Sequence, residues 1–477
     1  MSPVHPSPPF DPWLWVRAWN ETWLAGAWPP LSCSLRAQRL AALLGAARRG
    51  SPLYRRRSGG AHAFEDFAPI DKCELMQGFD DWATDRRITR AAAEAFLADA
   101  KTVGDGWLGG DYLLWSSSGT SGVPGWFVQD AASLAAYDAI DALRMRGAAP
   151  AQPALGLWGL DHRFAFVGAC GGHFAGVVSM ERLRRIVPAP LQPRIAIISV
   201  LQPLRDVATQ VKQFSPTVLI TYPSVAEALA PLQRAGALAL RLHEIWVGGE
   251  QLSSAQREEV QSAFGCTVRN SYGASECFSI AWECGQGQLH LNDDWVVLEP
   301  VDEHLRPVPP GTLSHTTLVT NLANRIQPII RYQLDDRVRV LPGRCRCGST
   351  FTRVEVEGRS GDTLHLPDTR RQPVAILPLA LETAIEEGAR VTQFQVIDHA
   401  RRGGHTLELR FEPAVTDPAA AFARCQAAIG HYLAAQGVTS TRCSFCAEPP
   451  RREAASGKLR RVVQGPAGGA RATRRAA

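Results

Sequence analysis

The middle of the chain alternates short apolar runs with longer amphipathic stretches. Four runs have the length and composition of buried strands: residues 195–200, 217–221, 244–247 and 267–270. The stretches between them have helical periodicity: residues 203–214, a segment that begins near 223, and residues 253–264. Strands that alternate with helices in this way predict βαβ units on a parallel sheet.

A parallel sheet predicts where a site lies as well as a fold. Ligands bind such sheets at the loops that leave the carboxyl ends of the strands. Three of these loops are rich in small and polar residues: 221–224 (Thr-Tyr-Pro-Ser), 248–250 (Gly-Gly-Glu) and 271–276 (Ser-Tyr-Gly-Ala-Ser-Glu). We therefore expect one concave site that all three loops form.

The pattern changes on both sides of this region. Helix formers at 36–49 and 90–100 predict a helical N-terminal part, residues 1–110. After residue 292 the elements shorten and predict a β-rich subdomain with a turn at 307–311 and strands at 312–321 and 329–333. The expected class is α/β, a large N-terminal domain with parallel and mixed sheets, helices and this subdomain.

A small α+β domain is expected from about residue 358 onward. Alternating patterns at 391–397 and 405–411 predict two strands, and 418–434 predicts a helix with Asp417 as its N-cap. The Gly/Ala/Arg-rich tail, residues 465–477, is typical of a disordered segment.

Composition narrows the function classes. The chain has 477 residues, of which 45% are hydrophobic and 20% charged, as in soluble proteins of two or more domains. A net charge of +5 with scattered arginines disfavours nucleic-acid binding. No signal pattern or membrane-length apolar run is present, and eleven cysteines, an odd number, disfavour a secreted disulfide scaffold. We therefore expect a cytoplasmic protein without a membrane partner.

A loop of hydroxyl residues and glycines follows the apolar run 112–115. It consists of Ser116, Ser117, Ser118, Gly119, Thr120, Ser121 and Gly122. Glycines let backbone N–H groups approach packed oxygens, and hydroxyls add neutral donors, which suits a triphosphate. The Gly-Lys-Ser/Thr of a lysine-bearing P-loop is missing. Taken alone, the composition also fits a linker.

Three further motifs follow this loop in order: Ser271-Tyr-Gly-Ala-Ser-Glu276, Ile330-Arg-Tyr-Gln-Leu-Asp-Asp336 and Ser456-Gly-Lys-Leu-Arg-Arg-Val462. The set resembles the adenylate-forming (AMP-binding) acyl-CoA synthetases over residues 53–462, and most of all the phenylacetate–CoA ligase-like branch. The resemblance implies an AMP-binding adenylation domain, residues 1–357, and a mobile C-terminal lid domain, residues 358–464.

The resemblance also implies roles for individual residues. The loop 116–122 would hold the phosphates of ATP, and Glu276 would bind Mg²⁺. Tyr272 would pack on adenine, Asp336 would accept from the ribose hydroxyls, and Lys458 would neutralise the α-phosphate and the carboxylate. The other implied nucleotide contacts are Gly248, Gly249, Glu250, Gly273, Ser275 and Arg359. The simpler alternatives are a solvated loop acid at 276, a turn cap at 336 and a surface lysine at 458.

A second group of residues has the composition of a metal site. Cys284 and His290 are followed by Cys345-Arg-Cys347-Gly348. Three thiols and one imidazole form a closed tetrahedral set that suits structural Zn²⁺. This set is similar to the zinc-binding cysteines of some members of the same branch, and the alternative is unrelated buried thiols. The pair Cys443 and Cys446 has no second half and indicates a structural role.

The acyl pocket is expected around the glycine-rich stretch 168–176. His173 and Phe174 would lie near the substrate carboxylate. Trp158, Phe174 and Tyr222 would form aromatic walls, and Pro223 would also bind the substrate. Aromatic side chains here favour an aryl or arylacetic acid. The alternative is that these residues belong to the hydrophobic core.

Three departures from the family pattern affect the acceptor and the charge of the site. We call the loop 116–122 the phosphate loop. The family usually has a basic residue near the proline that follows this loop, but here Val123 and Gly125 flank that proline and neither is basic. Gly361 stands where the family usually has an acidic residue at the hinge between the two domains. Residues 367–373 stand where the family has a glycine-containing loop that helps to form the entrance for the thiol. The acceptor is therefore left open between coenzyme A, the phosphopantetheine of an acyl carrier protein, and an amine.

These observations together predict an ATP-dependent acid–thiol ligase. It would form an acyl-adenylate from a small, aromatic or related carboxylic acid and pass the acyl group to a thiol. Two alternatives use the same loops: an adenylyltransferase that leaves AMP on its substrate, and a degenerate nucleotide-binding partner protein. The sequence makes no prediction about oligomeric state.

Overall fold

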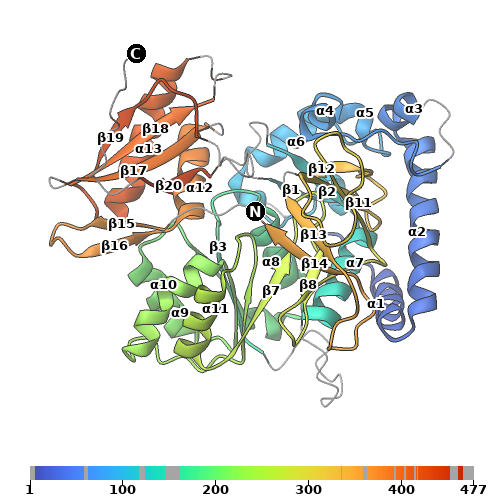
Figure 1. Ribbon diagram of the computed structural model, residues 1–477, viewed down its shortest axis with the longest axis horizontal. Coiled ribbons are helices and arrows are strands. Elements are labelled where there is room, and N and C mark those ends of the chain that lie inside the picture. The colour runs from blue at the N-terminus through green and yellow to red at the C-terminus, as the bar shows by residue number, and fades with distance from the viewer. Residues whose placement is uncertain are drawn as a thin grey trace.

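The N-terminal and C-terminal elements lie at opposite sides of the molecule (Figure 1). The computed structural model describes residues 6–58, 63–117, 124–145, 162–334, 336–357, 363–391, 394–401, 404–412, 415, 417–451 and 460–465. Within these residues no helix is both long and apolar enough to cross a membrane.

Helices form the N-terminal part, as predicted. They are α1 (Pro12–Ala27), α2 (Pro29–Gly50), α3 (Pro52–Ser58), α4 (Lys72–Gln77), α5 (Phe79–Trp82) and α6 (Arg90–Leu97). Proline opens α1 and α2, because the first helical turn needs no backbone N–H at that position. Asp11 caps α1 by accepting from the backbone N–H groups of Trp13 and Leu14. The helix predicted at 90–100 ends at Leu97.

A nine-stranded sheet forms the centre of the molecule. Its order is β13 (Arg337–Leu341), β14 (Arg353–Glu357), β9 (Leu289–Leu291), β8 (Ala281–Glu283), β7 (Thr267–Tyr272), β6 (Glu244–Val247), β5 (Val218–Thr221), β3 (Phe164–Gly168) and β4 (Ile195–Ser199). The strands from β7 to β4 are parallel, and those from β7 to β13 pair antiparallel. Four helices connect or flank the parallel strands: α8 (Ala175–Ile186), α9 (Leu204–Phe214), α10 (Pro223–Arg234) and α11 (Ser254–Phe264).

This arrangement confirms the predicted βαβ units. The sequence did not predict that β3 would enter between β4 and β5, because strand order depends on long-range packing. The predicted helix at 253–264 is observed, with Ser253 as its N-cap in a reciprocal capping box with Gln256.

Smaller sheets and one further helix cover the central sheet. They are the hairpin β1 (Leu113–Ser116) with β2 (Trp126–Gln129), the sheet β10 (Val296–Val301), β11 (Thr316–Asn321) and β12 (Tyr332–Leu334), and helix α7 (Ala131–Ile140), which is followed by the turn η3 (Asp141–Met145). The bounds predicted for the strand at 329–333 are wrong, because the observed strand β12 covers residues 332–334. Arg331 adopts a positive φ of 49°, which interrupts the extended run, so the strand begins only at Tyr332.

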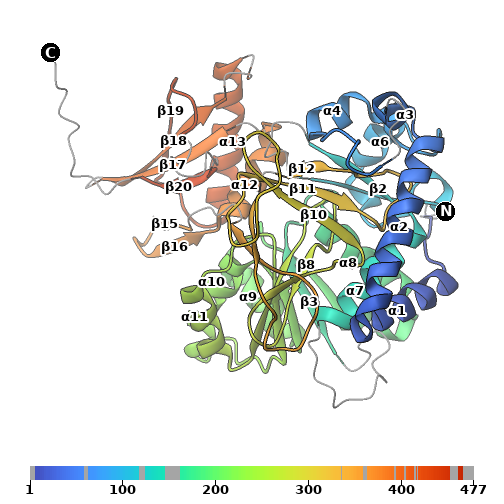
Figure 2. The ribbon, with the colours of Figure 1, turned by 45° about the vertical axis from the view of Figure 1, so that its right-hand side comes forward.

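The C-terminal elements form a two-stranded sheet, a four-stranded sheet and two helices (Figure 2). They are β15 (Leu364–Pro367), β16 (Pro373–Ile376), α12 (Pro378–Ala389), β17 (Phe394–Arg401), β18 (Gly404–Phe411), α13 (Pro418–Ala435), β19 (Arg442–Phe445) and β20 (Val462–Gln464). The predicted pair of strands and the helix with its Asp417 cap are confirmed. The proposed boundary at residue 358 and the tail from 466 onward lie outside the described residues.

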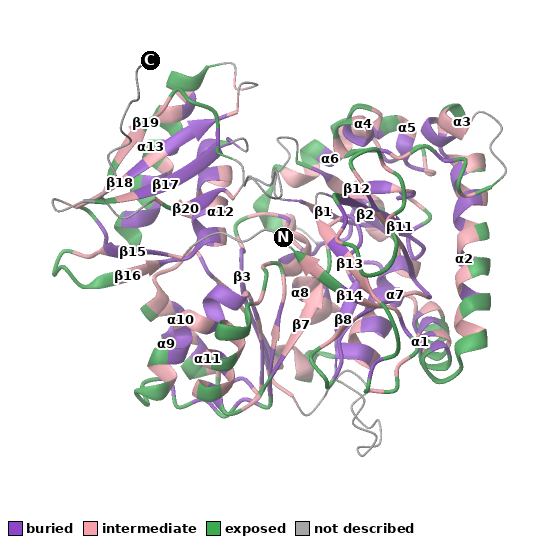
Figure 3. Ribbon diagram, viewed as in Figure 1, coloured by how far each residue is buried: buried purple, intermediate pink, exposed green. Residues whose placement is uncertain are grey.

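Buried residues form two large hydrophobic clusters (Figure 3). One cluster joins the N-terminal helices to β1, β2, α7 and the β10–β12 sheet. The other runs from the helices of the parallel sheet into the C-terminal elements, with Leu219 and Val225 on one side and Leu381 and Phe394 on the other. The Gln436 side-chain amide also donates to the carbonyl of Leu201, 3.1 Å away. The helices of the parallel sheet and the C-terminal elements thus share one hydrophobic cluster.

Candidate functional site

A cavity of about 1630 Å³ opens at the carboxyl ends of β5, β6 and β7. All three predicted loops contribute to it, through Thr221 and Tyr222, residues 248–250, and residues 271–276. Leu379, Glu382 and Thr383 of α12 border it from the C-terminal side, together with Arg460 and Arg461. The prediction of one concave site formed by separate loops is therefore confirmed.

Most of the predicted site residues line this cavity: Ser116, Ser117, Phe174, Tyr222, Gly248, Gly249, Glu250, Tyr272, Gly273, Ser275, Glu276 and Asp336. Four groups lie outside the described residues, namely 118–122 of the phosphate loop, Trp158, Arg359, and Lys458. His173 and Pro223 are described but do not line the cavity.

Glu276 is a buried carboxylate held by neighbours from distant elements. The Tyr332 hydroxyl donates to Glu276 Oε1 at 2.8 Å, and Lys72 Nζ lies 3.6 Å from the same oxygen. The backbone before it turns tightly at Gly273, where a Cβ would come within 1.9 Å of the Phe278 carbonyl oxygen. Only glycine therefore fits this turn, which presents the carboxylate to the cavity.

Lys72 is a site residue that the sequence analysis did not identify. It opens α4, and its Nζ lies 3.4 Å from Ser117 Oγ as well as close to Glu276. Its position follows from the backbone, because Ile70 pairs with Tyr332, donating to the Arg331 carbonyl and accepting from the Gln333 N–H. A cation thus stands between the start of the phosphate loop and the acidic residue.

One signal for Lys72 was present in the sequence. The chain has only four lysines among its 51 basic Lys and Arg residues: Lys72, Lys101, Lys212 and Lys458. In an arginine-dominated chain, a lysine is a candidate for a compact point charge in a binding site.

The described ends of the phosphate loop are tied together. Ser117 N donates to the Gly125 carbonyl at 2.8 Å, and Gly125 N donates to Ser117 Oγ at 2.9 Å. A Cβ at Gly125 would come within 2.6 Å of the Phe127 ring. The hairpin β1–β2 therefore fixes both ends of the loop beside Lys72.

Tyr272 and Asp336 form the opposite wall. The Tyr272 hydroxyl donates to Asp336 Oδ2 at 3.1 Å, and burial beside this carboxylate raises the pKa of Tyr272 well above its ordinary value. The phenol is therefore neutral, and its ring presents an apolar face to the cavity.

Gly249 and Glu250 shape the loop between β6 and α11. Gly249 has a φ of +79°, which favours glycine, and a Cβ there would lie 3.3 Å from the Tyr222 ring. The Glu250 carboxylate accepts from the backbone N–H and the hydroxyl of Ser224, both at 3.0 Å, at the start of α10. Glu250 thereby joins two of the three loops.

His173 departs from its predicted position. Its carbonyl accepts from Ser116 N at 2.7 Å, and its Nε2 lies 2.9 Å from Thr102 Oγ1, so the ring packs near Phe96 and away from the cavity. Burial lowers the pKa of His173 to about 4. His173 therefore does not line the cavity, whereas the neighbouring Phe174 does, and the contact of His173 with the substrate carboxylate stays a prediction. Pro223 is buried as the first residue of α10.

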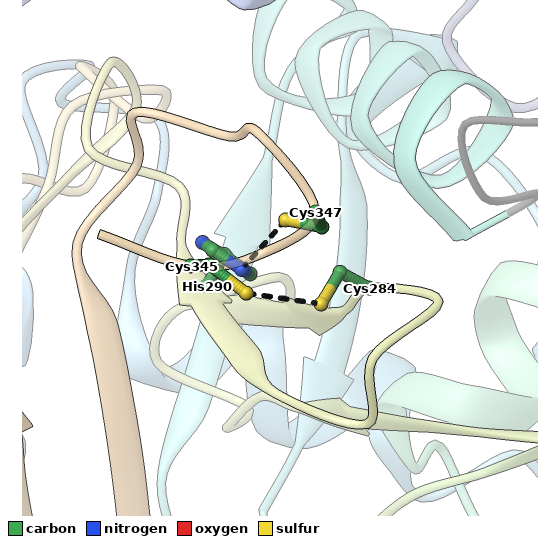
Figure 4. A group of neighbouring side chains, drawn as sticks. All are labelled: Cys284, His290, Cys345 and Cys347. Carbon is green, nitrogen blue, oxygen red and sulfur yellow. Dashed lines mark hydrogen bonds between the residues drawn. The ribbon is translucent and has the colours of Figure 1, made fainter.

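The four predicted metal ligands come together on the antiparallel side of the central sheet (Figure 4). Cys284 follows β8, His290 lies in β9, and Cys345 and Cys347 lie between β13 and β14. Their ligand atoms all lie within 4.8 Å of one another. His290 Nδ1 lies 2.9 Å from the Phe351 carbonyl oxygen, which leaves Nε2 facing the sulfurs.

The distances in this cluster fit a tetrahedral ion. Zinc bonds of about 2.3 Å to sulfur and 2.0 Å to nitrogen put two sulfurs about 3.8 Å apart and a sulfur–nitrogen pair about 3.5 Å apart. The observed Cys284–Cys345 distance is 3.8 Å and the Cys347–His290 distance is 3.4 Å. Asp336, which lines the cavity, directly precedes β13, so an ion here would also anchor the strand that follows this residue.

Part of the chain is similar in sequence to known proteins. Residues 194–312 match the family model of AMP-binding enzymes. Phenylacetate-coenzyme A ligase of Escherichia coli (strain K12) is 28% identical over 214 residues, 41% of this chain and 45% of that protein. The Pseudomonas putida enzyme of the same name is 26% identical over 221 residues, 42% and 47% respectively. The chain thus spans about half the length of the curated relatives it matches.

A solved structure matches over most of its length. The crystal structure of 2-hydroxyisobutyryl-CoA ligase, in complex with 2-HIB-AMP and CoA, has a TM-score of 0.55 and covers 92% of this chain and 90% of that one. Its sequence identity is 18%, so this likeness shows the fold, a mixed α/β architecture with a smaller C-terminal part.

Proposed function

We propose that this protein, an adenylate-forming protein of the phenylacetate–CoA ligase-like branch, uses ATP to activate a carboxylic acid and transfers the acyl group to a thiol. The observation that carries the proposal is the convergence of Lys72, Ser117 and Glu276 at one side of the cavity and Tyr272 and Asp336 at the other. One side of the cavity is therefore cationic and rich in hydroxyl groups, which suits the phosphates of a nucleoside triphosphate. The other side is aromatic, which suits the base.

The chemistry follows from the charges. A carboxylate oxygen attacks the α-phosphorus of ATP, the bond to the β-phosphate oxygen breaks, and pyrophosphate leaves. Lys72 and the loop that begins at Ser116 would bind the phosphates, and Glu276 would hold Mg²⁺, which neutralises phosphate charge. Tyr272 would pack on the base, and Asp336 would accept from the ribose hydroxyls. In the second step a thiol attacks the acyl carbon, and AMP leaves.

Exchange of labelled pyrophosphate into ATP tests the proposal. We expect exchange that depends on one class of acid, measured with a panel of aryl, arylacetic and aliphatic acids. Free coenzyme A added to the productive acid should then yield AMP and a thioester. A stable adenylylated product without thiol dependence would instead indicate an adenylyltransferase, and ATP binding without any exchange would indicate a degenerate binding protein.

We also propose that Cys284, His290, Cys345 and Cys347 bind one structural zinc ion. Its role would be to tie the β8–β9 hairpin to the turn between β13 and β14, because zinc contributes directly to the folding free energy of such sites.

Replacing one ligand should remove the metal. For Cys347→Ser we expect the zinc content, measured by elemental analysis of purified protein, to fall from about one ion per chain to a small fraction. The unfolding temperature should fall by at least about 5 °C. Cys33→Ser is the matched control, because Cys33 is an exposed thiol outside the cluster. Equal zinc content in the two variants would rule out the site.

A further inference from the structure

The cavity is lined by a carboxyl group that the proposed chemistry does not use, that of Asp141. Asp141 stands where α7 passes into the π-helical turn η3, a kind of irregularity that is frequent at functional sites. Its side chain lines the cavity and accepts from the Ser279 hydroxyl at 2.9 Å. Ser279 lies three residues after Glu276 in the chain, and Asp141, Ser279 and Glu276 all line the cavity.

Aromatic side chains next in sequence to this pair also line the cavity. Tyr137 precedes Asp141 by one helical turn and Phe278 precedes Ser279, and their ring centroids lie 5.7 Å apart. Trp15 and Trp19 of α1 also border the cavity. Such walls suit the apolar body of a small acid, in particular a ring. An acidic group among them is costly unless a ligand or a partner satisfies it.

The neighbouring cations are committed to other carboxylates. Arg182 makes a bidentate contact with Asp138, at 2.8 and 3.1 Å. Arg144 donates to Asn292 at 2.6 Å and to Asp294 at 2.8 Å. Within the described parts of the chain, Ser279 is the one hydrogen-bond partner of the Asp141 side chain, and no cation pairs with it. Burial raises the pKa of Asp141 to about 7.

We propose that Asp141 selects acids that carry a hydroxyl or amino group on the part of the molecule remote from the reacting carboxylate. This inference rests on the proposed function. A donor on the substrate would satisfy the carboxyl oxygen that Ser279 leaves available, whereas an unsubstituted acid of the same size would bury that oxygen without a partner. Sites built to bind a hydroxyl or amino group reject the analogue that lacks it far more strongly than apolar pockets distinguish sizes.

Matched pairs of acids test this selectivity. Pyrophosphate exchange is measured with phenylacetate against 4-hydroxyphenylacetate, benzoate against 4-hydroxy- and 4-aminobenzoate, and hexanoate against 6-hydroxy- and 6-aminohexanoate. We expect kcat/KM for the best donor-bearing acid to exceed that of its unsubstituted partner by ~100-fold or more. In Asp141→Leu the same ratio should fall below about tenfold, because the leucine offers no acceptor.

Asp141→Asn separates the two donor groups and preserves the shape of the side chain. Its amide oxygen still accepts from a hydroxyl or a neutral amine but carries no charge for an ammonium group. The ratio should therefore fall more for 6-aminohexanoate, whose amino group is an ammonium, than for the hydroxy acids and 4-aminobenzoate. Asp206→Asn is the matched control, because Asp206 is a half-exposed aspartate on α9, and its ratios should equal those of the unmodified protein. Thermal unfolding confirms that each variant is folded.

The outcomes distinguish a failure of the role of Asp141 from a failure of the proposed function. Exchange with equal kcat/KM within every pair, or an unchanged ratio in a folded Asp141→Leu or Asp141→Asn variant, overturns the role of Asp141 alone. Exchange with no acid of the panel, while ATP binds, overturns the proposed function and this inference with it.

Discussion

Replacing Lys458 by alanine is expected to slow adenylate formation by ~100- to 1,000-fold, the usual effect of removing one group that stabilises transition-state charge. The resemblance of 456–462 to the family motif carries this prediction, together with the position of Arg460 and Arg461 in the cavity wall. The ammonium group would neutralise negative charge that builds on the α-phosphate as the carboxylate attacks. ATP binding should change by less than about threefold, because this charge is largest in the transition state.

Single-turnover formation of the adenylate measures this effect, and calorimetry measures ATP binding. Lys101→Ala is the matched control, because Lys101 is an exposed lysine that does not line the cavity. If Lys458→Ala forms the adenylate at the rate of the control, the assigned role is refuted and residue 458 is a surface lysine.

Replacing Lys72 by methionine is expected to weaken both ATP binding and catalysis. Lys72 lies between Ser117 and Glu276, where the phosphates and Mg²⁺ would be bound, so its charge acts on the ground state as well as on the transition state. We expect ATP affinity to fall by ~10-fold and kcat/KM for ATP by ~100-fold. Methionine keeps a linear, apolar side chain of similar length, so the lost group is the charge.

Lys72→Arg provides the conservative comparison. It restores the positive charge and should recover part of the ATP affinity lost in Lys72→Met, whereas a purely structural role for the lysine stem would be satisfied by methionine. If Lys72→Met binds ATP as tightly as Lys101→Ala, then Lys72 does not supply the positive charge that the phosphate loop lacks.

The βαβ pattern and the main motifs of this protein could be predicted from the sequence because they depend on neighbours along the chain. Strand and helix periodicities located the parallel strands, and the loops at 221–224, 248–250 and 271–276 meet at one cavity as expected. The cluster of Cys284, His290, Cys345 and Cys347 was also predicted from residue types, because few combinations of ligands have so specific a chemistry.

Tertiary structure alone decided which other side chains reach the cavity. Lys72 arrives because Ile70 pairs with Tyr332, a backbone contact between segments more than 250 residues apart that no local pattern encodes. Asp141 faces the cavity because η3 follows α7 beside Ser279, whereas His173 turns to Thr102 because its carbonyl pairs with Ser116. Local sequence therefore determined the elements and the chemical types of this site. Long-range strand pairing and packing determined the direction of each side chain, since these contacts form only when distant segments fold together.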